Sequence, residues 1–260
     1  MSLERIAVVS DTHLCSTSER LDLLGDAYKF LSEERGVSTV FHAGDITDGY
    51  KVYKGQEFFL KCYGADDQAN YVCEHYPQIK GVTTRFILGN HDMKHFDTSG
   101  VDIGKIISRD RPDLVYLGQY FARVQFDKAT LDLVHPSGGF SYAISYPLQR
   151  YVNELEGGSK ANILIMGHYH RTLYTVYRNI NCLMPGAFQD QNDYTRRRGL
   201  QPNKGFWIIE FEHDTKGISM FRPEWHAYYE LKDTRIVEQM SKLRDEPLKK
   251  PNTRAKKRLT

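Results

Sequence analysis

Five short clusters of aspartate, asparagine and histidine stand out in this chain of 260 residues. Imidazole and carboxylate groups together suit divalent ions such as manganese, iron, zinc or nickel. One ion needs about three or four protein ligands, and the clusters offer more than that, so they predict two ions. The clusters are Asp11-Thr12-His13, Gly44-Asp45-Ile46-Thr47-Asp48, Gly89-Asn90-His91-Asp92, His135 and Gly167-His168-Tyr169-His170.

The spacing within the clusters fits a metal site. Residues two apart in an extended segment share a face, so Asp11 can converge with His13, and His168 with His170. Glycines before Asp45, Asn90 and His168 let the chain turn sharply as it leaves a strand. A single Asp-x-His is common by chance, but five such clusters in order are specific. The remaining histidines are interpreted as structural or surface residues: His42, His75, His95, His213 and His226.

Hydrophobic periodicity predicts the elements that position the clusters. Short apolar runs predict strands at residues 5–10, 37–43, 84–88, 114–117, 122–126, 130–134, 163–166, 172–177, 180–184 and 206–211. Helical spacing predicts helices at 19–35, 53–75, 101–107, 145–155 and 235–244. Five of the strands end directly in a cluster, and sites in α/β sheets gather at the carboxyl ends of strands.

The order of these elements predicts a layered α/β fold with mixed sheets. We expect one domain over residues 1–240 and a basic, flexible tail over 241–260. Six basic residues and no acidic residue follow Leu248, whereas the rest of the chain is mildly acidic. Such a tail is compatible with a polyanionic partner, or with a simply solvated terminus.

The sequence favours an intracellular protein. No apolar run approaches the roughly 18 residues of a membrane-spanning helix, and the N-terminus lacks the features of a signal peptide. The four cysteines, Cys15, Cys62, Cys73 and Cys182, are scattered, without the close spacing of a zinc or redox pair. We therefore expect a cytoplasmic location and no membrane partner. The oligomeric state stays open, with a homodimer as one alternative.

Together the five clusters resemble the motifs of the calcineurin-like metallophosphoesterases over residues 5–212. The resemblance implies a four-layer α-β-β-α sandwich of two mixed sheets, with two divalent metals at the sheet edge. It implies one metal held by Asp11, His13, Asp45 and His170, and a second held by Asp45, Asn90, His135 and His168. Asp45 would bridge the two. We expect manganese, with iron, zinc, nickel and magnesium as alternatives.

Two metals of this kind clamp a phosphate ester and activate a hydroxide for attack on phosphorus. Asn90 already fills the ligand position of its cluster. We therefore expect His91 to be catalytic, as the acid that protonates the leaving oxygen or as a donor to the phosphate. Asp92 is expected to orient His91 and raise its pKa. Asp48 is expected to hydrogen-bond within its own turn.

Several features indicate a phosphodiester substrate. Protein phosphatases of this superfamily carry Arg-Gly after the second aspartate and end the third motif in glutamate. This chain has Asp48-Gly49-Tyr50 and Asp92 there, so it resembles the phosphodiesterase and nuclease branch. Residues 185–210 are similar to the end of the phosphoesterase domain in small subunits of archaeal family D DNA polymerases.

Aromatic and basic residues near these motifs leave two interpretations open. Arg196, Arg197 and Arg198 with Tyr194 suit a polynucleotide with stacked bases, or form a solvated loop over the site. A second group is expected to be core or subunit-contact residues, with capping of the cleft or base stacking as the alternative. Its members are Tyr50, Tyr53, Phe58, Phe59 and Tyr63.

These features predict a dinuclear-metal phosphodiesterase, a nuclease with DNA or RNA as partner and substrate. One alternative is a hydrolase of small nucleotides, phosphomonoesters or other small phosphate compounds. Another is a weakly catalytic scaffold that binds nucleic acid or a partner subunit. The complete ligand set and His91 favour an enzyme.

Overall fold

The computed structural model describes residues 2–214 and 217–229. One compact unit spans Met1–Tyr228. The expected tail, its boundary at residue 240 and the helix expected at 235–244 lie outside the described residues. Within the part that is described, no helix is both long and apolar enough to cross a membrane.

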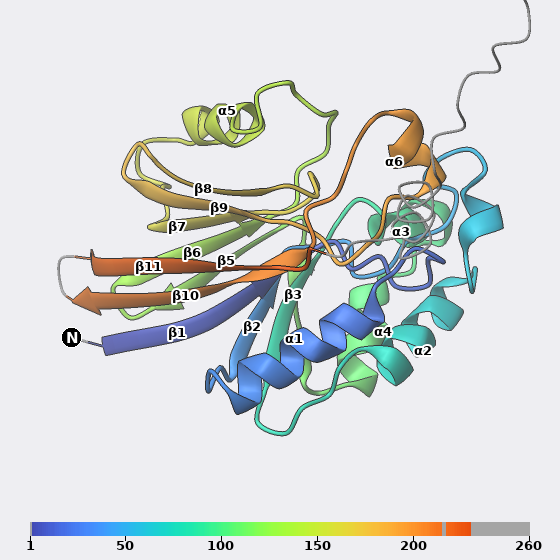
Figure 1. Cartoon of the computed structure of the whole chain (residues 1–260), viewed down its shortest axis with the longest axis horizontal. Helices are drawn as coiled ribbons and strands as arrows, with labels where there is room; N and C mark the ends of the chain where they lie inside the picture. Colours follow the sequence, from blue (N-terminus) through green and yellow to red (C-terminus); the bar gives the residue numbers. More distant parts are fainter. Residues whose placement is uncertain (1, 215–216, 230–260) are drawn as a thin grey trace, which may run out of the picture. The chain divides into compact units, whose positions relative to one another are not determined.

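Two mixed sheets form the centre of this unit (Figure 1). In the first sheet four neighbouring strands are parallel, and two antiparallel strands continue the sheet beyond β1. In spatial order its strands are β11 (Gly217–Ala227), β10 (Gly205–Asp214), β1 (Ser2–Val9), β2 (Thr39–His42), β3 (Thr83–Leu88) and β4 (Leu114–Gln119).

The second sheet has a parallel centre and antiparallel edges. In spatial order its strands are β5 (Phe121–Phe126), β6 (Ala129–Val134), β7 (Ile163–Met166), β9 (Ile180–Pro185) and β8 (Thr172–Tyr177). The carboxyl ends of β1, β2 and β3 lie at one edge of the first sheet. Those of β6 and β7 lie at one edge of the second.

Alternation along β1 shows how the layers pack. Ile6 and Val8 belong to the core between the two sheets, whereas Ala7 and Val9 belong to the core under the helices. That second core is covered by α1 (Leu21–Glu33), α2 (Ala65–His75) and α4 (Ile103–Asp110). A third core joins the outer face of the second sheet to α5 (Tyr146–Glu154). The predicted α-β-β-α sandwich of two mixed sheets is confirmed.

The prediction of one long helix over residues 53–75 is wrong. The segment forms a short 3-10 helix, η1 (Gln56–Phe59), and then α2, with an extended stretch between them. Gly55 has a left-handed backbone with φ of 88°, and Leu60 and Gly64 are extended, so no continuous helix passes through them. The helices α3 (Met93–Ser99) and α6 (Asp193–Arg197) were not expected.

Strand β11 was not expected either, because it contains Pro223. Proline lacks the N–H that a central strand needs for its ladder. Here it is tolerated because β11 is an edge strand that pairs with β10 alone.

Candidate metal centre

The five clusters meet where the two sheets lie side by side. Loops after β1, β2 and β3 carry the first three clusters, and loops after β6 and β7 carry the last two. Contact crosses between the sheets, since Asp45 Oδ2 lies 3.1 Å from His135 Nε2. The predicted convergence at the carboxyl ends of strands therefore holds in the geometry.

The backbone of these loops is unusual. Five of the expected ligands have a left-handed backbone: Asp11, His13, Asp45, His168 and His170, with φ between 46° and 82°. Residues with a Cβ rarely adopt this conformation, and each instance costs on the order of 1–3 kcal/mol. The expected extended geometry for Asp11 with His13, and for His168 with His170, is thus wrong. The side chains converge through tight left-handed turns instead.

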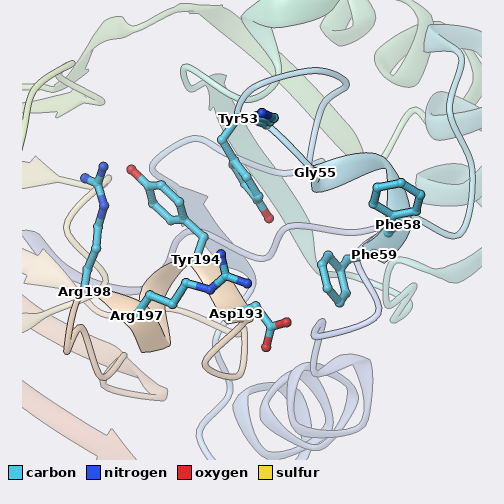
Figure 2. A pocket seen from close by; sticks show the side chains of 9 residues that line it. Tyr53, Gly55, Phe58, Phe59, Asp193, Tyr194, Arg197 and Arg198 are labelled. Carbon is cyan, nitrogen blue, oxygen red and sulfur yellow. The ribbon is translucent and has the colours of Figure 1, made fainter.

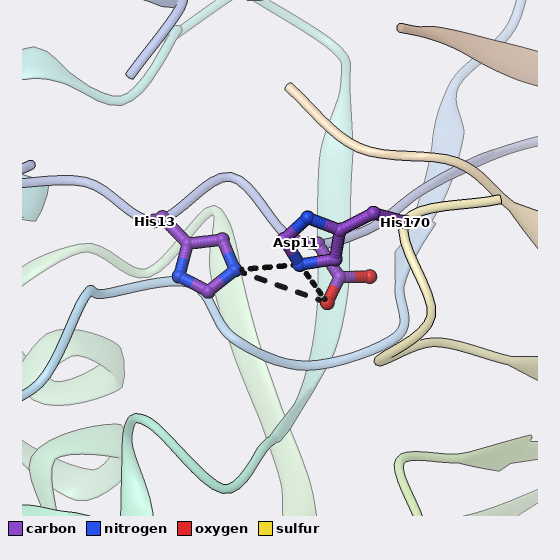
Figure 3. Close-up of side chains that lie close together, drawn as sticks. All are labelled: Asp11, His13 and His170. Carbon is purple, nitrogen blue, oxygen red and sulfur yellow. Dashed lines mark hydrogen bonds and ion pairs between the residues drawn. The ribbon is translucent and has the colours of Figure 1, made fainter. Parts of the chain in front are cut away.

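The first group of ligating atoms comes from Asp11, His13 and His170 (Figure 3). The Nε2 atoms of His13 and His170 lie 3.0 Å apart, and Asp11 Oδ1 lies 3.3 Å from His170 Nε2. The carboxylate of Asp11 also accepts hydrogen bonds from the backbone N–H of His168 at 3.1 Å. Asp45 Oδ2 lies 3.8 Å from His13 Nε2, so it reaches this group too.

The second group comes from Asp45, Asn90, His135 and His168. The oxygen Asn90 Oδ1 lies 2.8 Å from His168 Nδ1 and 3.2 Å from His135 Nε2. Asp45 Oδ2 completes the group beside His135. Asp45 therefore adjoins both groups, which is the arrangement that a bridging carboxylate requires.

Hydrogen bonds on the far side of three of the rings orient them. His13 Nδ1 donates to Asp48 Oδ1 at 3.0 Å, and His135 Nδ1 donates to the carbonyl of Ala43 at 2.7 Å. His168 Nε2 donates to the carbonyl of Gly138 at 2.8 Å. In a neutral imidazole the second nitrogen then carries a lone pair.

The second nitrogen of each of these rings faces other ligating atoms. His13 Nε2 faces His170 and Asp45, His135 Nε2 faces Asp45 and Asn90, and His168 Nδ1 faces Asn90 Oδ1. Imidazole nitrogens, carboxylate oxygens and an amide oxygen that converge in a buried site are the ligands that a divalent cation requires. The donor set therefore fits divalent metal ions, and its division into two groups around Asp45 fits a pair.

Ionisation differs among the buried groups. Burial raises the pKa of Asp11, but the neighbouring His170 outweighs it and brings that pKa to about 2. Burial and, to a smaller extent, the nearby His135 lower the pKa of His168 to about 4. Metal binding requires ionised carboxylates and neutral imidazoles, and these two residues are in that form at neutral pH. Burial lowers the pKa of His135, but Asp45 outweighs it and raises that pKa to about 9, so a metal must displace its proton.

His91 lies beside the first group but is oriented by Asp48. Its Nδ1 donates to the backbone carbonyl of Asp48 at 2.7 Å, and the Asp48 carboxylate lies 3.5 Å away. Burial lowers the pKa of His91, but Asp45 and Asp48 outweigh it and raise that pKa to about 10. The ring also lies within ligating range of His13 and Asp45.

Two expectations about the carboxylates are wrong. Asp92 does not orient His91: its carboxylate accepts hydrogen bonds from the amides of Ile46, Thr47 and Gly89 at 2.7–3.1 Å. It therefore joins the loop after β2 to the loop after β3. Asp48 does not bond within its own turn, because it accepts from His13 and from Gln56 Nε2 at 2.9 Å.

Sequence reasoning missed the roles of Gln56 and Gly89. Gln56 is fully buried and holds the carboxylate that orients His13, but nothing in its neighbourhood in the sequence indicates this. Gly89 was expected to allow a sharp turn. Its importance is space, because a Cβ there would lie 2.2 Å from Asp45 Oδ1 and 2.7 Å from His135 Cε1.

Both groups open into one cleft of about 150 Å³. Its walls include His91 and the backbone of Gly138 and Gly139, together with Tyr53, Tyr194 and Arg198. A cleft of this volume has room for a phosphate group and a few waters, since one water occupies about 30 Å³ in the liquid.

The sequence family described as calcineurin-like phosphoesterase superfamily domain matches residues 5–201. A DNA polymerase II small subunit from Methanothermobacter thermautotrophicus is 22% identical over 243 residues, a match that covers 77% of this chain. The chain spans about half of the length of that relative, since the match covers 50% of it.

Two solved structures are similar to the chain at low identity. One, described as a novel archaeal phosphodiesterase, is 15% identical with a TM-score of 0.45, and the match covers 86% of this chain and 100% of the other. The second, a putative 5′-nucleotidase from Staphylococcus aureus, is 12% identical with a TM-score of 0.46 and coverage of 93% and 58%.

Proposed function

The chain belongs to the calcineurin-like phosphoesterase superfamily, and from that premise we propose that it is a dinuclear-metal hydrolase of phosphodiester bonds, with nucleic acid as its substrate. The observation that carries the proposal is the convergence of imidazole nitrogens and carboxylate oxygens in two groups that share Asp45. Manganese is the ion we propose.

In this proposal Asp11, His13, Asp45 and His170 hold one ion, and Asp45, Asn90, His135 and His168 hold the other. Two ions held there would supply positive charge for the phosphate and would lower the pKa of a water that serves as the nucleophile. Asp48, Ala43 and Gly138 keep the imidazoles of His13, His135 and His168 aimed at the ions.

His91 is the residue that we propose to act on the leaving group. Its Nδ1 is engaged by the Asp48 carbonyl, which leaves Nε2 as its second donor when the ring is protonated. The carboxylates of Asp45 and Asp48 favour the protonated ring, so it can donate a proton or a hydrogen bond to an oxygen of the phosphate.

A nucleic-acid substrate is supported by the match to a DNA polymerase II small subunit. It is also supported by the charge of the chain near the cleft, where Arg196, Arg197 and Arg198 follow one another at α6. The basic residues after Leu248 add further positive charge. Contacts of this kind to phosphates make binding depend strongly on salt concentration.

Two variants test the metal centre and the acid separately. We expect His91→Ala to retain both ions, measured by elemental analysis, and to lose at least about 100-fold in kcat on an aryl phosphodiester, as general acid catalysis contributes about 10²–10⁴-fold. We expect Asp45→Asn to lose metal, because the bridging charge is removed. Full turnover by the first variant, or two ions bound by the second, would contradict these roles.

A substrate panel with added manganese tests the proposed substrate. It compares single- and double-stranded oligonucleotides, cyclic nucleotides, and aryl mono- and diesters. Hydrolysis of oligonucleotides, with binding that weakens as salt rises and on deletion of residues 248–260, supports a nuclease. Turnover of cyclic nucleotides alone would replace it with a hydrolase of small nucleotides.

A further inference from the structure

A second and larger hollow adjoins the metal cleft. It has a volume of about 720 Å³, within the range of about 300–1,000 Å³ that is usual for small-molecule pockets. Figure 2 shows Phe58 and Phe59 on one side of it, Tyr194 and Arg197 on the other, and Tyr53 between them. We call this hollow the aromatic pocket.

The aromatic pocket and the metal cleft share a wall. Tyr53, Tyr194 and Arg198 line both hollows. Tyr53 and Tyr194 are stacked with ring centroids 4.7 Å apart, and the guanidinium of Arg198 lies 4.4 Å from the centroid of Tyr194. A substrate with its phosphate in the cleft therefore has a row of aromatic and guanidinium groups leading away from it.

The far side of the aromatic pocket is formed by residues that do not line the cleft. Phe58 is 80% exposed, which is unusual for a phenylalanine in a folded domain. Of the two expected roles for Phe58, the core position is thus wrong, and the subunit contact stays a prediction. An exposed ring that faces other rings across a hollow of this size is suited to stacking with a planar ligand.

The positive charge of the aromatic pocket favours planar ligands that carry negative charge. Lys54, Arg197 and Arg198 line it, against Asp193 as the acidic member of the lining. Arg197 and Arg198 form no ion pair with any residue that the structure describes. A ligand with a planar ring and a negatively charged backbone matches both the rings and the cations.

We propose that the aromatic pocket binds an unpaired nucleobase that adjoins the phosphodiester held in the metal cleft. This inference rests on the proposed function and specifies it: the substrate is a single strand or a frayed end. A paired base is already stacked within its duplex, so its ring faces are not available to Phe58 and Phe59. Base stacking on aromatic side chains tolerates any sequence, and we therefore expect little base preference.

The test uses residues that line the aromatic pocket and not the metal cleft. Phe58→Leu keeps the apolar character but removes the ring, Phe58→Tyr restores a ring, and Arg197→Ala removes a charge. Arg178→Ala is the matched control, because this exposed arginine lies in the turn between β8 and β9. Substrates are an oligothymidylate, the same backbone with abasic residues, and methyl p-nitrophenyl phosphate, a small diester.

For Phe58→Leu we expect kcat/KM on the oligothymidylate, relative to that on the small diester, to fall about 5- to 150-fold, the range of one lost base stack. Phe58→Tyr should restore the ratio, and the abasic strand should show little difference between Phe58→Leu and the native chain. Binding of the labelled oligothymidylate in EDTA, followed by fluorescence anisotropy, should weaken in Phe58→Leu and Arg197→Ala but not in Arg178→Ala.

The outcomes separate this inference from the proposed function. If the native chain hydrolyses neither diester, the proposed function fails. If it hydrolyses both but Phe58→Leu keeps the native ratio, or if the abasic strand is cleaved as well as the oligothymidylate, the base-binding pocket is refuted. Equal cleavage of blunt duplex and single strand would also overturn it, as would saturation of the pocket by mononucleotides with no binding of strands.

Discussion

At the scale of single residues, two aspartates that are not proposed as metal ligands, Asp48 and Asp92, hold the metal centre in position. Asp48 holds His13 by its carboxylate and His91 by its backbone carbonyl, so the ligand and the proposed acid have a common support. Asp92 ties the amides of two loops together. Partners of this kind orient metal ligands, and their loss typically costs about 10- to 100-fold in metal affinity or activity.

Gly89 yields a prediction at this scale. Gly89→Ala would place a methyl group 2.2 Å from Asp45 Oδ1, closer than any contact permits, so Asp45 must move. We expect this variant to lose most of its bound metal and its activity while retaining its secondary structure. Elemental analysis and circular dichroism check both parts.

Gly25→Ala is the matched control for that substitution. Gly25 lies within α1, and a Cβ there would meet no atom within 4 Å. We expect it to bind metal normally and to raise the free energy of unfolding by about 0.5–1 kcal/mol, since alanine favours a helix over glycine. A Gly89→Ala protein with normal metal content would show that Asp45 is less constrained than the geometry indicates.

At the scale of elements, the loop after β1 lies against the segment between η1 and α2. Cys15 in that loop and Cys62 in that segment have their sulfur atoms 2.7 Å apart, and both are free thiols. Burial raises the pKa of Cys15, while the hydrogen bond between the two sulfurs lowers the pKa of Cys62. The spacing of the cysteines in the sequence had indicated no pair.

We predict that mild oxidation joins these two cysteines. With oxidised glutathione, the two thiols lose two protons and two electrons, a disulfide forms between Cys15 and Cys62, and glutathione is released as two thiols. Peptide mapping after alkylation should find this bridge in the native chain and in Cys73→Ser, but not in Cys62→Ser. Recovery of both alkylated cysteines from the oxidised native chain would contradict the prediction.

The elements that could be predicted are those with one dominant physical signal. Strands such as β7 and β8 are short apolar or alternating runs, and they were predicted with the observed bounds. The segment from 53 to 75 misled because its aromatic residues suggest a buried helix, whereas Phe58 and Tyr63 are exposed and Phe58 lines a surface hollow. Strand β11 was missed because Pro223 argues against any strand except an edge strand.

At the scale of the whole unit, metal should stabilise the fold. The ligating atoms come from loops of both sheets and are mostly buried, so a cation bound between them joins those loops. We predict that manganese raises the melting temperature and that EDTA reverses the rise. At a free concentration 100 times the dissociation constant, a single site adds about 2.7 kcal/mol. Asp45→Asn is the control that should show little shift.

The candidate ligands could be predicted from the sequence because each cluster directly follows a strand, and the fold brings the ends of parallel strands together. What supports the ligands could not be predicted. Gln56 donates to Asp48, the carbonyl of Ala43 accepts a hydrogen bond from His135, and Gly89 leaves space for Asp45. Each of these depends on distances between separate loops. The left-handed backbone at five expected ligands could not be predicted either, because aspartate and histidine adopt that conformation only occasionally.

The contact between His13 and His170 joins residues that are 157 positions apart in the chain. At least the first 170 of the 260 residues must be synthesised, and the two sheets must be docked, before these rings can meet. Contacts of such long range form late, because closing a long loop costs entropy that only later interactions repay. We therefore expect metal uptake during refolding to lag behind the recovery of secondary structure, so that a nascent or half-folded chain has no hydrolytic centre.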